Sequence, residues 1–229
     1  MRRQGKGTKK GTMTNNPDGI VLIATPRSPF ARRIRLALGM RGVPHDVRMT
    51  DVFQPSPELL ESNPLALVPV FFDPASGEWI PDSDTILDVL DESPVLARSS
   101  LSPIWPVHSV NRPRVRLRSR WATGLMTATV AHFLERARAG APDPEVLAEH
   151  ENAIRRTLDR VESDLGRHPD FWGAGSDPTQ AGWDLAVALA YLDLRMAALN
   201  WRNQHPQCSQ FLEICEKNQE FQATRPPVA

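Results

Sequence analysis

Serine hydroxyls stand at two points where the sequence predicts the start of a helix. Ser28 directly precedes Pro29, and Ser83 follows Asp82 just ahead of an apolar run with helical spacing. A serine at such a start caps the helix, because its hydroxyl accepts a bond from a backbone N–H that the helix leaves free. The positive end of the helix dipole lies at the same place and attracts anions. Each serine is therefore either a plain cap or a cap that also helps to bind an anion.

A valine–proline pair, Val68-Pro69, opens an apolar run that continues to Phe72. An X–Pro bond is cis in only about 5–6% of folded cases, so a cis bond here would be a specific feature of the fold. The other interpretation is an ordinary trans proline on an edge strand. The pattern alone leaves both open.

Few residues of this chain could perform thiol chemistry or bind a metal ion. Cys208 and Cys215 are the two cysteines of the chain, and on one helix they would lie about 10.5 Å apart. A disulfide needs Cα atoms within about 7 Å, so both are expected to be small buried side chains. The histidines are scattered without the spacing of metal ligands, so no metal site is expected.

Alternating strands and helices carry the serines and the valine–proline pair. A strand, a helix and a second strand in this order imply a parallel pair with a right-handed crossover, and the later pair of strands implies a hairpin covered by a helix. This is an α/β domain over residues 20–92. Its predicted elements are strands at Ile20–Ala24, His45–Met49, Val68–Phe72 and Glu78–Ile80, a helix from Ser28 to Gly42, a helical turn at Glu58–Leu60 and a helix at Ser83–Glu92.

The second half of the chain shows helical periodicity and no strand signals. Residues 93–113 are rich in serine and proline and are predicted to be a linker. The change of pattern after them marks a domain boundary, and residues 114–229 are predicted to form an all-helical domain. The expected helices are Arg114–Arg138, Pro144–Leu165, Pro178–Asn200 and Gln207–Asn218.

Composition excludes several classes of protein. The chain has 229 residues with 27 basic and 27 acidic side chains, so it lacks the basic excess typical of nucleic-acid binders. No stretch approaches the roughly 18 apolar residues of a membrane span. Residues 1–19 are basic and almost without apolar side chains. They are expected to be a disordered tail, with an organellar presequence or a true start at Met13 as the other interpretations. They hold no export signal, so a cytoplasmic location is expected.

Three segments, taken together and in this order, resemble the cytosolic glutathione transferase superfamily. The resemblance covers residues 20–225, and the runs at 190–195 and 221–227 are similar to bacterial members. It implies a thioredoxin-like N-terminal domain, an all-helical C-terminal domain and glutathione as co-substrate. The three segments are Ser28-Pro-Phe-Ala-Arg-Arg-Ile-Arg-Leu-Ala-Leu38, Asn63-Pro-Leu-Ala-Leu-Val-Pro-Val70 and Ile80-Pro-Asp-Ser-Asp-Thr-Ile86.

The resemblance also implies roles for individual residues. Ser28, as in serine-type members, would donate a hydrogen bond to the glutathione thiolate and favour its ionised form. Val68, ahead of a cis Pro69, would pair with the cysteinyl backbone as an added strand does. At the γ-glutamyl end, Asp82 would accept from the ammonium group and Ser83 would bind the carboxylate. For both serines a plain helix cap remains the alternative.

The helical domain is expected to line the pocket for the electrophile. Arg120, Trp121 and Leu125 are the candidates, although apolar residues at helical spacing are more often core. Thr25 is a rival to Ser28 as the hydroxyl that contacts the thiol. No cysteine stands in this loop, which argues against members that use one for thiol transfer.

Two positions depart from the family pattern. Leu67 stands before Val68 where a basic or amide residue often binds the glycyl carboxylate, so one charged contact is missing unless Arg32, Arg33 or His45 supplies it. In the helical domain the family's capping box, Ser/Thr-x-x-Asp, reads Thr179-Gln-Ala-Gly182, with Asp184 displaced by two residues. The reciprocal cap is therefore expected to be broken or shifted.

The sequence thus predicts a glutathione transferase that conjugates the glutathione thiolate to an apolar electrophile. A glutathione-dependent disulfide or peroxide reductase, and a binding scaffold without catalysis, are the alternatives, and Leu67 favours the scaffold. Family members are commonly dimers, so a homodimer is expected, without a nucleic-acid or membrane partner.

Overall fold

A computed structural model describes residues 16, 19–93, 103–107, 110–174 and 178–227. Most of the predicted basic tail and half of the predicted linker lie outside these residues. Of the tail, Asn16 bonds to both the N–H and the C=O of Ile20, ahead of the first strand. Of the linker, Ile104 and Trp105 are buried, and the Trp105 indole donates to Asp88 at 2.9 Å.

The first half of the chain folds into a four-stranded sheet with three helices. The strand order is β2-β1-β3-β4. The parallel pair β1–β2 and the antiparallel hairpin β3–β4 are as the sequence predicts, and β1 pairs with β3 antiparallel. The elements are β1 (Val21–Ala24), α1 (Pro29–Met40), β2 (Asp46–Met49), α2 (Pro57–Ser62), β3 (Val70–Asp73), β4 (Glu78–Pro81) and α3 (Ser83–Glu92).

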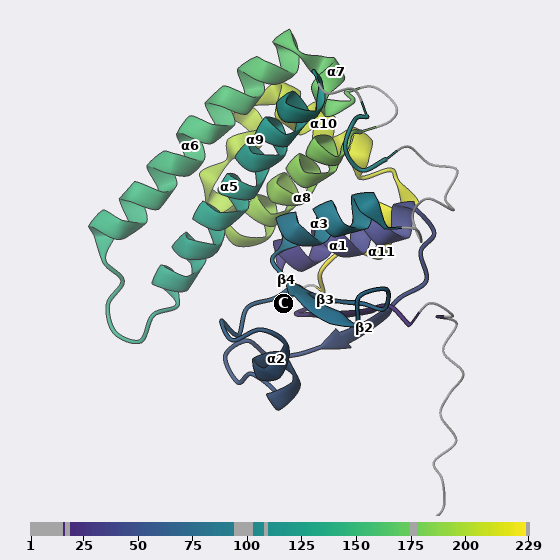
Figure 1. The fold of residues 1–229 in the computed structure, drawn as a ribbon. Helices are drawn as coiled ribbons and strands as arrows, with labels where there is room; N and C mark the ends of the chain where they lie inside the picture. The colour runs from purple at the N-terminus through teal and green to yellow at the C-terminus, as the bar shows by residue number, and fades with distance from the viewer. Residues whose placement is uncertain (1–15, 17–18, 94–102, 108–109, 175–177, 228–229) are drawn as a thin grey trace, which may run out of the picture.

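In the second half of the chain, every element of secondary structure among the described residues is a helix. Its two longest helices, α5 and α6, lie side by side and rise above the sheet domain (Figure 1). The elements are α5 (Arg112–Arg136), α6 (Pro144–Arg167), α7 (Pro169–Trp172), α8 (Gln180–Arg195), the 3-10 helix η1 (Ala197–Leu199), α9 (Trp201–Gln204), α10 (Pro206–Cys215) and α11 (Gln219–Ala223). The predicted fold class, a thioredoxin-like domain followed by a helical domain, is confirmed.

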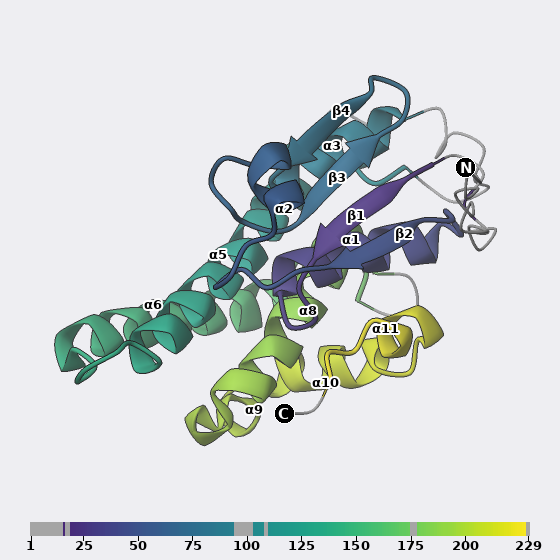
Figure 2. The same ribbon diagram turned by 90° about the horizontal axis from the view of Figure 1, so that it is seen from below.

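The sheet is covered differently on its two faces. Helices α1 and α3 lie between the sheet and the helical domain, and α2 covers the opposite face (Figures 1 and 2). Side chains alternate along β1, so Leu22 joins the large core shared with α1, α3 and α8, while Ile23 joins a small cluster with Leu59 and Val70. The continuous core beneath α1 joins the two halves of the chain.

Several element boundaries differ from the predicted ones for local reasons. The third strand starts at Val70 rather than Val68, because the cis bond precedes it. The helix expected at Pro178–Asn200 ends at Arg195, and a left-handed Asn200 then separates η1 from α9. Helix α5 begins at Arg112, inside the predicted linker. The helix expected at Gln207–Asn218 is α10, which ends at Cys215, and the sequence does not predict the short helices α7 and α11.

Candidate functional site

Ser28 lies where β1 ends and α1 begins. The residue is half-buried, and its Oγ accepts a hydrogen bond from the N–H of Ala31 at 3.1 Å, so it is the N-cap of α1. This bond uses an oxygen lone pair and leaves the hydroxyl hydrogen available as a donor. Thr25 is also half-buried, and its carbonyl accepts from the N–H of Ser28 at 3.3 Å. The two rival hydroxyls therefore belong to one tight loop.

The Val68–Pro69 peptide bond is cis. Its loop is held by the buried Asn63, whose amide donates to the carbonyl of Leu67 at 2.9 Å and accepts from the N–H of Leu65. No described residue hydrogen-bonds to the N–H or C=O of Val68. An extended backbone with both groups free can accept a peptide as an added strand.

The sheet register brings the three predicted segments to one end of the sheet. Ile23 pairs with Val70, and Val70 pairs with Pro81 on the other side. The loop after β1, the cis bond before β3 and the helix start after β4 are therefore neighbours. Ser28, the Val68–Pro69 pair and the Asp82–Ser83 pair each stand on one of these segments.

Asp82 and Ser83 form the start of α3. The N-cap is Asp82, so the expectation that Ser83 caps this helix is wrong, and Ser83 is the first helical residue. Asp82 adopts a left-handed backbone (φ 72°), and its Oδ1 accepts from the N–H groups of Asp84 and Thr85, each at 3.0 Å. Ser83 is only 4% exposed, and its Oγ accepts from the Arg33 guanidinium at 3.0 Å. No described residue accepts the Ser83 hydroxyl hydrogen. The hydroxyl hydrogen and the N–H of Ser83 therefore have no protein acceptor among the described residues.

Arg33 is fully buried behind Ser83. It makes a bidentate ion pair with the equally buried Asp184, at 2.9 and 2.7 Å, and a further bond to Asp84 at 2.6 Å. Ser119 accepts from Arg33 and donates to Asp184 at 2.6 Å. Burial alone would lower the pKa of Arg33, but Asp184 and then Asp84 outweigh it and hold that pKa above its ordinary value. One arginine thus joins α1, α3, α5 and α8.

The network accounts for the displaced aspartate of the capping box. Thr179 still caps α8, accepting from the N–H of Gly182 at 3.3 Å. A Cβ at Gly182 would lie 2.1 Å from the carbonyl oxygen of Trp172, so an aspartate side chain has no space there. The carboxylate stands instead at Asp184, where Arg33 neutralises it. The predicted loss of the reciprocal cap is confirmed.

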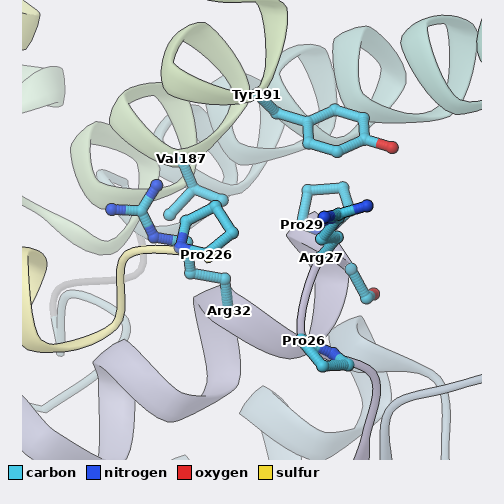
Figure 3. A pocket seen from close by; sticks show the side chains of 8 residues that line it. Pro26, Arg27, Pro29, Arg32, Val187, Tyr191 and Pro226 are labelled. Atoms are coloured by element: carbon cyan, nitrogen blue, oxygen red, sulfur yellow. The ribbon is translucent and has the colours of Figure 1, made fainter. Parts of the chain in front are cut away.

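A small hollow opens beside Ser28, between the two domains (Figure 3). Its walls come from the loop after β1, the first turns of α1, the α8 residues Val187 and Tyr191, and Pro226 near the end of the chain. Its free volume for a water-sized sphere is about 10 Å³, close to the space of one water molecule. Two arginines, Arg27 and Arg32, line it as well.

The three residues expected to line the electrophile pocket lie apart from this hollow. Leu125 is 1% exposed and belongs to the core, so its side chain faces no open site. Trp121 packs against the core, with the guanidinium groups of Arg118 and Arg160 over its ring. Arg120 is exposed and lies 3.5 Å from Asp84, at the start of α3. Of the three, only Arg120 stands near a predicted glutathione residue.

Leu67 and the cysteines lie where the sequence suggests. Leu67 is 60% exposed and offers no polar group to a ligand.

Cys208 and Cys215 are free and buried. Burial, together with Glu162 at Cys208 and Glu216 at Cys215, raises both thiol pKa values, that of Cys215 to about 12. Neither thiol ionises near neutral pH.

The described residues contain neither a metal site nor a membrane span. They hold no group of three or more side chains suited to a metal ion. None of their helices is both long enough and apolar enough to cross a membrane.

The polar residues that the sequence reading missed carry a detectable signal. Arg33 lies at helical spacing with Phe30 and Ala37, on the side of α1 that becomes buried. Asp184 likewise interrupts the apolar run of α8. A charge inside an apolar stripe needs a buried partner of opposite sign. What the sequence did not indicate is which charge pairs with which.

Comparison with known proteins agrees with the geometry. Two family models match the chain, the glutathione S-transferase N-terminal domain over residues 22–96 and the glutathione S-transferase C-terminal domain over residues 144–213. Glutathione S-transferase U3 of Arabidopsis thaliana is 37% identical over 93 residues, which are 38% of this chain and 40% of that protein.

Two further similarities extend over almost the whole chain. The uncharacterized GST-like protein YibF of Escherichia coli (strain K12) is 27% identical over 210 residues, or 91% of this chain and 99% of that protein. The crystal structure of a glutathione S-transferase from Methylobacillus flagellatus KT with glutathione bound is similar with a TM-score of 0.81, at 27% identity, over 91% of this chain and 100% of that one. Together with the fold and the two matched domains, this shows that the chain belongs to the glutathione S-transferase superfamily.

Proposed function

We propose that the protein binds glutathione at the end of its sheet and conjugates the glutathione thiolate, through a new C–S bond, to a small apolar electrophile. The observation that carries this proposal is the sheet register, which gathers Ser28, the cis Val68–Pro69 bond and the Asp82–Ser83 pair at one end of the sheet. The glutathione bound to the Methylobacillus flagellatus relative supports the same ligand here.

The cysteinyl residue and the γ-glutamyl end of the tripeptide each have matching groups in this arrangement. The free main-chain groups of Val68 pair with the cysteinyl residue, as in an added strand. The γ-glutamyl end carries both signs of charge: the Asp82 carboxylate accepts from its ammonium group, and the N–H and hydroxyl of Ser83 donate to its carboxylate. The Asp82 Oδ2 atom has no protein partner among the described residues and is available for this.

Ser28 is the residue proposed to act on the sulfur. Its hydroxyl hydrogen is available, and the N-terminus of α1 places a positive dipole end beside it. Both effects stabilise a thiolate over a thiol and so lower the pKa of bound glutathione below the ordinary value of about 8.5 for a thiol. The thiolate then attacks the electrophilic carbon. We assign Thr25, in the same loop, no contact with the sulfur.

Transfer to an electrophile is favoured over disulfide or peroxide reduction by the state of the protein thiols. A reductase that forms a mixed disulfide with the enzyme needs a reactive cysteine. Both cysteines are buried and have raised pKa values, and both stand on α10 rather than near Ser28. If this chain reduced a disulfide or a peroxide, both reacting thiols would have to come from two glutathione molecules.

Calorimetric titration with glutathione tests the binding step. Saturable binding is expected, and Asp82→Asn should weaken it because the ammonium group loses its counter-charge. Glu78→Gln, an exposed carboxylate change on the neighbouring strand, is the matched control and should bind as the unmodified protein does. Absence of heat at millimolar glutathione would contradict the proposed function.

A further inference from the structure

Tyr191 is the only tyrosine of the chain and stands on α8, in the helical domain. Together with Ser28 it lines the hollow between the two domains, which has space for about one water molecule. Because the hollow is so small, the two side chains lie within reach of one small molecule. Figure 3 shows the Tyr191 ring beside Pro29, with its hydroxyl turned away from Val187 and Pro226. The hydroxyl therefore points away from these two apolar walls.

The Tyr191 hydroxyl has a hydrogen to donate. Its oxygen accepts a bond from the Nε of Arg195, one turn further along α8, at 3.2 Å, and no described residue accepts its hydrogen. Burial raises the pKa of Tyr191 above its ordinary value, and the hydrogen bond and charge of Arg195 oppose this only in part. The hydroxyl therefore stays protonated at neutral pH and acts as a donor.

Arg195 holds this hydroxyl in place and polarises it. The guanidinium carbon of Arg195 lies 3.8 Å from the centre of the Phe133 ring and 5.4 Å from that of Tyr191. Arg195 makes an ion pair with no described carboxylate, so its positive charge is not cancelled nearby. A donor bound to the phenol oxygen draws electron density from it and strengthens the O–H as a donor in turn.

The groups on this side of Ser28 are donors without an acceptor. The hydroxyl hydrogens of Ser28 and Tyr191 have no acceptor among the described residues, and neither do the Nη atoms of Arg195. Arg27 is half-buried and pairs with no described residue. The Ser28 hydroxyl is assigned to the sulfur, so that of Tyr191 is available to a different atom. The apolar walls disfavour an ion and suit a neutral molecule with an acceptor oxygen.

We propose that Tyr191, held by Arg195, donates a hydrogen bond to the carbonyl oxygen of the electrophile, and that the electrophile is a small α,β-unsaturated carbonyl compound. The inference rests on the proposed function, since it names the substrate class of that site. It keeps the apolar body that the sequence predicts for the electrophile and adds one acceptor. The hollow is too small for such a molecule, so the electrophile lies on the side to which the hydroxyl is turned.

A donor at this oxygen favours the reaction more than the binding of the substrate. The carbonyl oxygen is neutral when the electrophile binds and gains negative charge in the transition state. The hydrogen bond from Tyr191 is therefore strongest in the transition state, which lowers the barrier. Tyr191 is thus a catalytic residue in this proposal, and Arg195 is a positioning residue that acts through it.

The chemical step balances with 3-hexen-2-one as the probe. The glutathione thiolate donates an electron pair to the β-carbon, a C–S bond forms, and the electrons of the C=C bond move towards the carbonyl oxygen to give an enolate. Tyr191 donates its hydrogen bond to that oxygen. Water then protonates the α-carbon and the carbonyl bond is restored. The hydroxide that remains takes up the proton released when the glutathione thiol ionised.

The matched probe without an acceptor oxygen is 1-iodohexane. It has the same number of carbon atoms, and the thiolate displaces iodide without charge developing on an oxygen. The measured quantity is the enone preference, which is kcat/KM for 3-hexen-2-one divided by kcat/KM for 1-iodohexane. Each value is first divided by the rate constant with free glutathione at the same pH. The unmodified protein is expected to favour the enone by about tenfold.

Tyr191→Phe keeps the ring and removes only the hydroxyl, so the variant is expected to fold. It should lower the enone preference about tenfold, through kcat more than through KM, because the lost bond is made in the transition state. Arg195→Gln should lower it by a smaller factor, since Tyr191 keeps its hydroxyl and loses only its partner. Equal enhancement of both probes by the unmodified protein, or an unchanged preference in Tyr191→Phe, would overturn the proposal.

Thr129→Val is the matched control variant. It removes a fully buried hydroxyl from α5, which donates to the Leu125 carbonyl at 2.7 Å, and Thr129 does not line the hollow. The enone preference should stay within about twofold of that of the unmodified protein. A loss as large as that of Tyr191→Phe would mean that any hydroxyl lost from the helical domain disturbs the site, which overturns the role of Tyr191.

Glutathione binding separates this proposal from the proposed function. Tyr191→Phe should leave both the calorimetric Kd for glutathione and the pKa of the bound thiol unchanged. A raised thiol pKa would mean that Tyr191 acts on the sulfur, which overturns the enone proposal and leaves the proposed conjugation standing. If the unmodified protein binds no glutathione, the proposed function itself fails.

Discussion

Two consecutive arginines on α1 are buried to a similar degree and stand in opposite electrostatic surroundings. Arg33 is held by Asp184 and Asp84, and its pKa is raised. Arg32 has only neutral partners, and its pKa is lowered to about 10. The charge of Arg33 is compensated by two carboxylates, whereas that of Arg32 is met only by a carbonyl and a hydroxyl. The following variants test whether this distinction holds, from the largest expected change in stability to the smallest.

Arg33→Met should destabilise the protein most, by about 3–5 kcal/mol, because it leaves the Asp184 carboxylate buried without its counter-charge. The free energy of unfolding from urea denaturation, followed by tryptophan fluorescence, measures this loss. The double variant Arg33→Met with Asp184→Leu should recover much of it, since no charge is then left unpaired. A loss below about 1 kcal/mol for the single variant would contradict the structural role of Arg33.

Asp84→Asn should cost about 1 kcal/mol. Asp84 is the more exposed of the two carboxylates that bind Arg33, with its side chain 35% exposed, so water partly replaces it. The same denaturation assay applies, with glutathione calorimetry as a second readout. A cost as large as that of Arg33→Met would show that Asp84, rather than Asp184, provides the main compensation.

Arg32→Met is expected to change stability by less than about 1 kcal/mol. Two hydrogen bonds are lost, to Phe221 and Thr224, but a buried charge without a counter-charge is removed and the stem still packs on the Phe221 ring. Thermal unfolding compared at equal protein concentration provides the measurement. A loss that equals that of Arg33→Met would remove the contrast between the two arginines.

Arg120→Gln should have the smallest effect, within about 0.5 kcal/mol. Its ion pair with Asp84 spans 3.5 Å on the surface, with the Arg120 side chain 73% exposed, and such pairs contribute little. Urea midpoints of the variant and the unmodified protein should nearly coincide. A substantial shift would place Arg120 inside the network instead of at its edge.

The order of elements and the end of the sheet that carries the site could be predicted from sequence. Ser28 before Pro29, Val68-Pro69 and Asp82-Ser83 each have a local signature, because caps and proline positions depend on neighbouring residues. The parallel β1–β2 pair and the β3–β4 hairpin follow from the chain order of a βαβ unit and a hairpin. These features depend on interactions that are close in sequence.

The residues that the sequence did not reveal depend on contacts far apart along the chain. Arg33 and Asp184 stand 151 positions apart, and either could have paired with another charge. The hollow needs α8 and Pro226 to lie beside the loop after β1, which no local pattern indicates. Leu125 was assigned to a pocket because an apolar face of α5 does not show whether it meets a cleft or a neighbouring helix.

The central claim is that Ser28 stabilises the thiolate of bound glutathione, and the absorbance of that thiolate against pH tests it most directly. The bound thiol should titrate below the value for free glutathione, and Ser28→Ala should raise the bound pKa by one unit or more while Thr25→Ala leaves it unchanged. An unshifted thiol pKa in the complex, or a rise only in Thr25→Ala, would contradict the account.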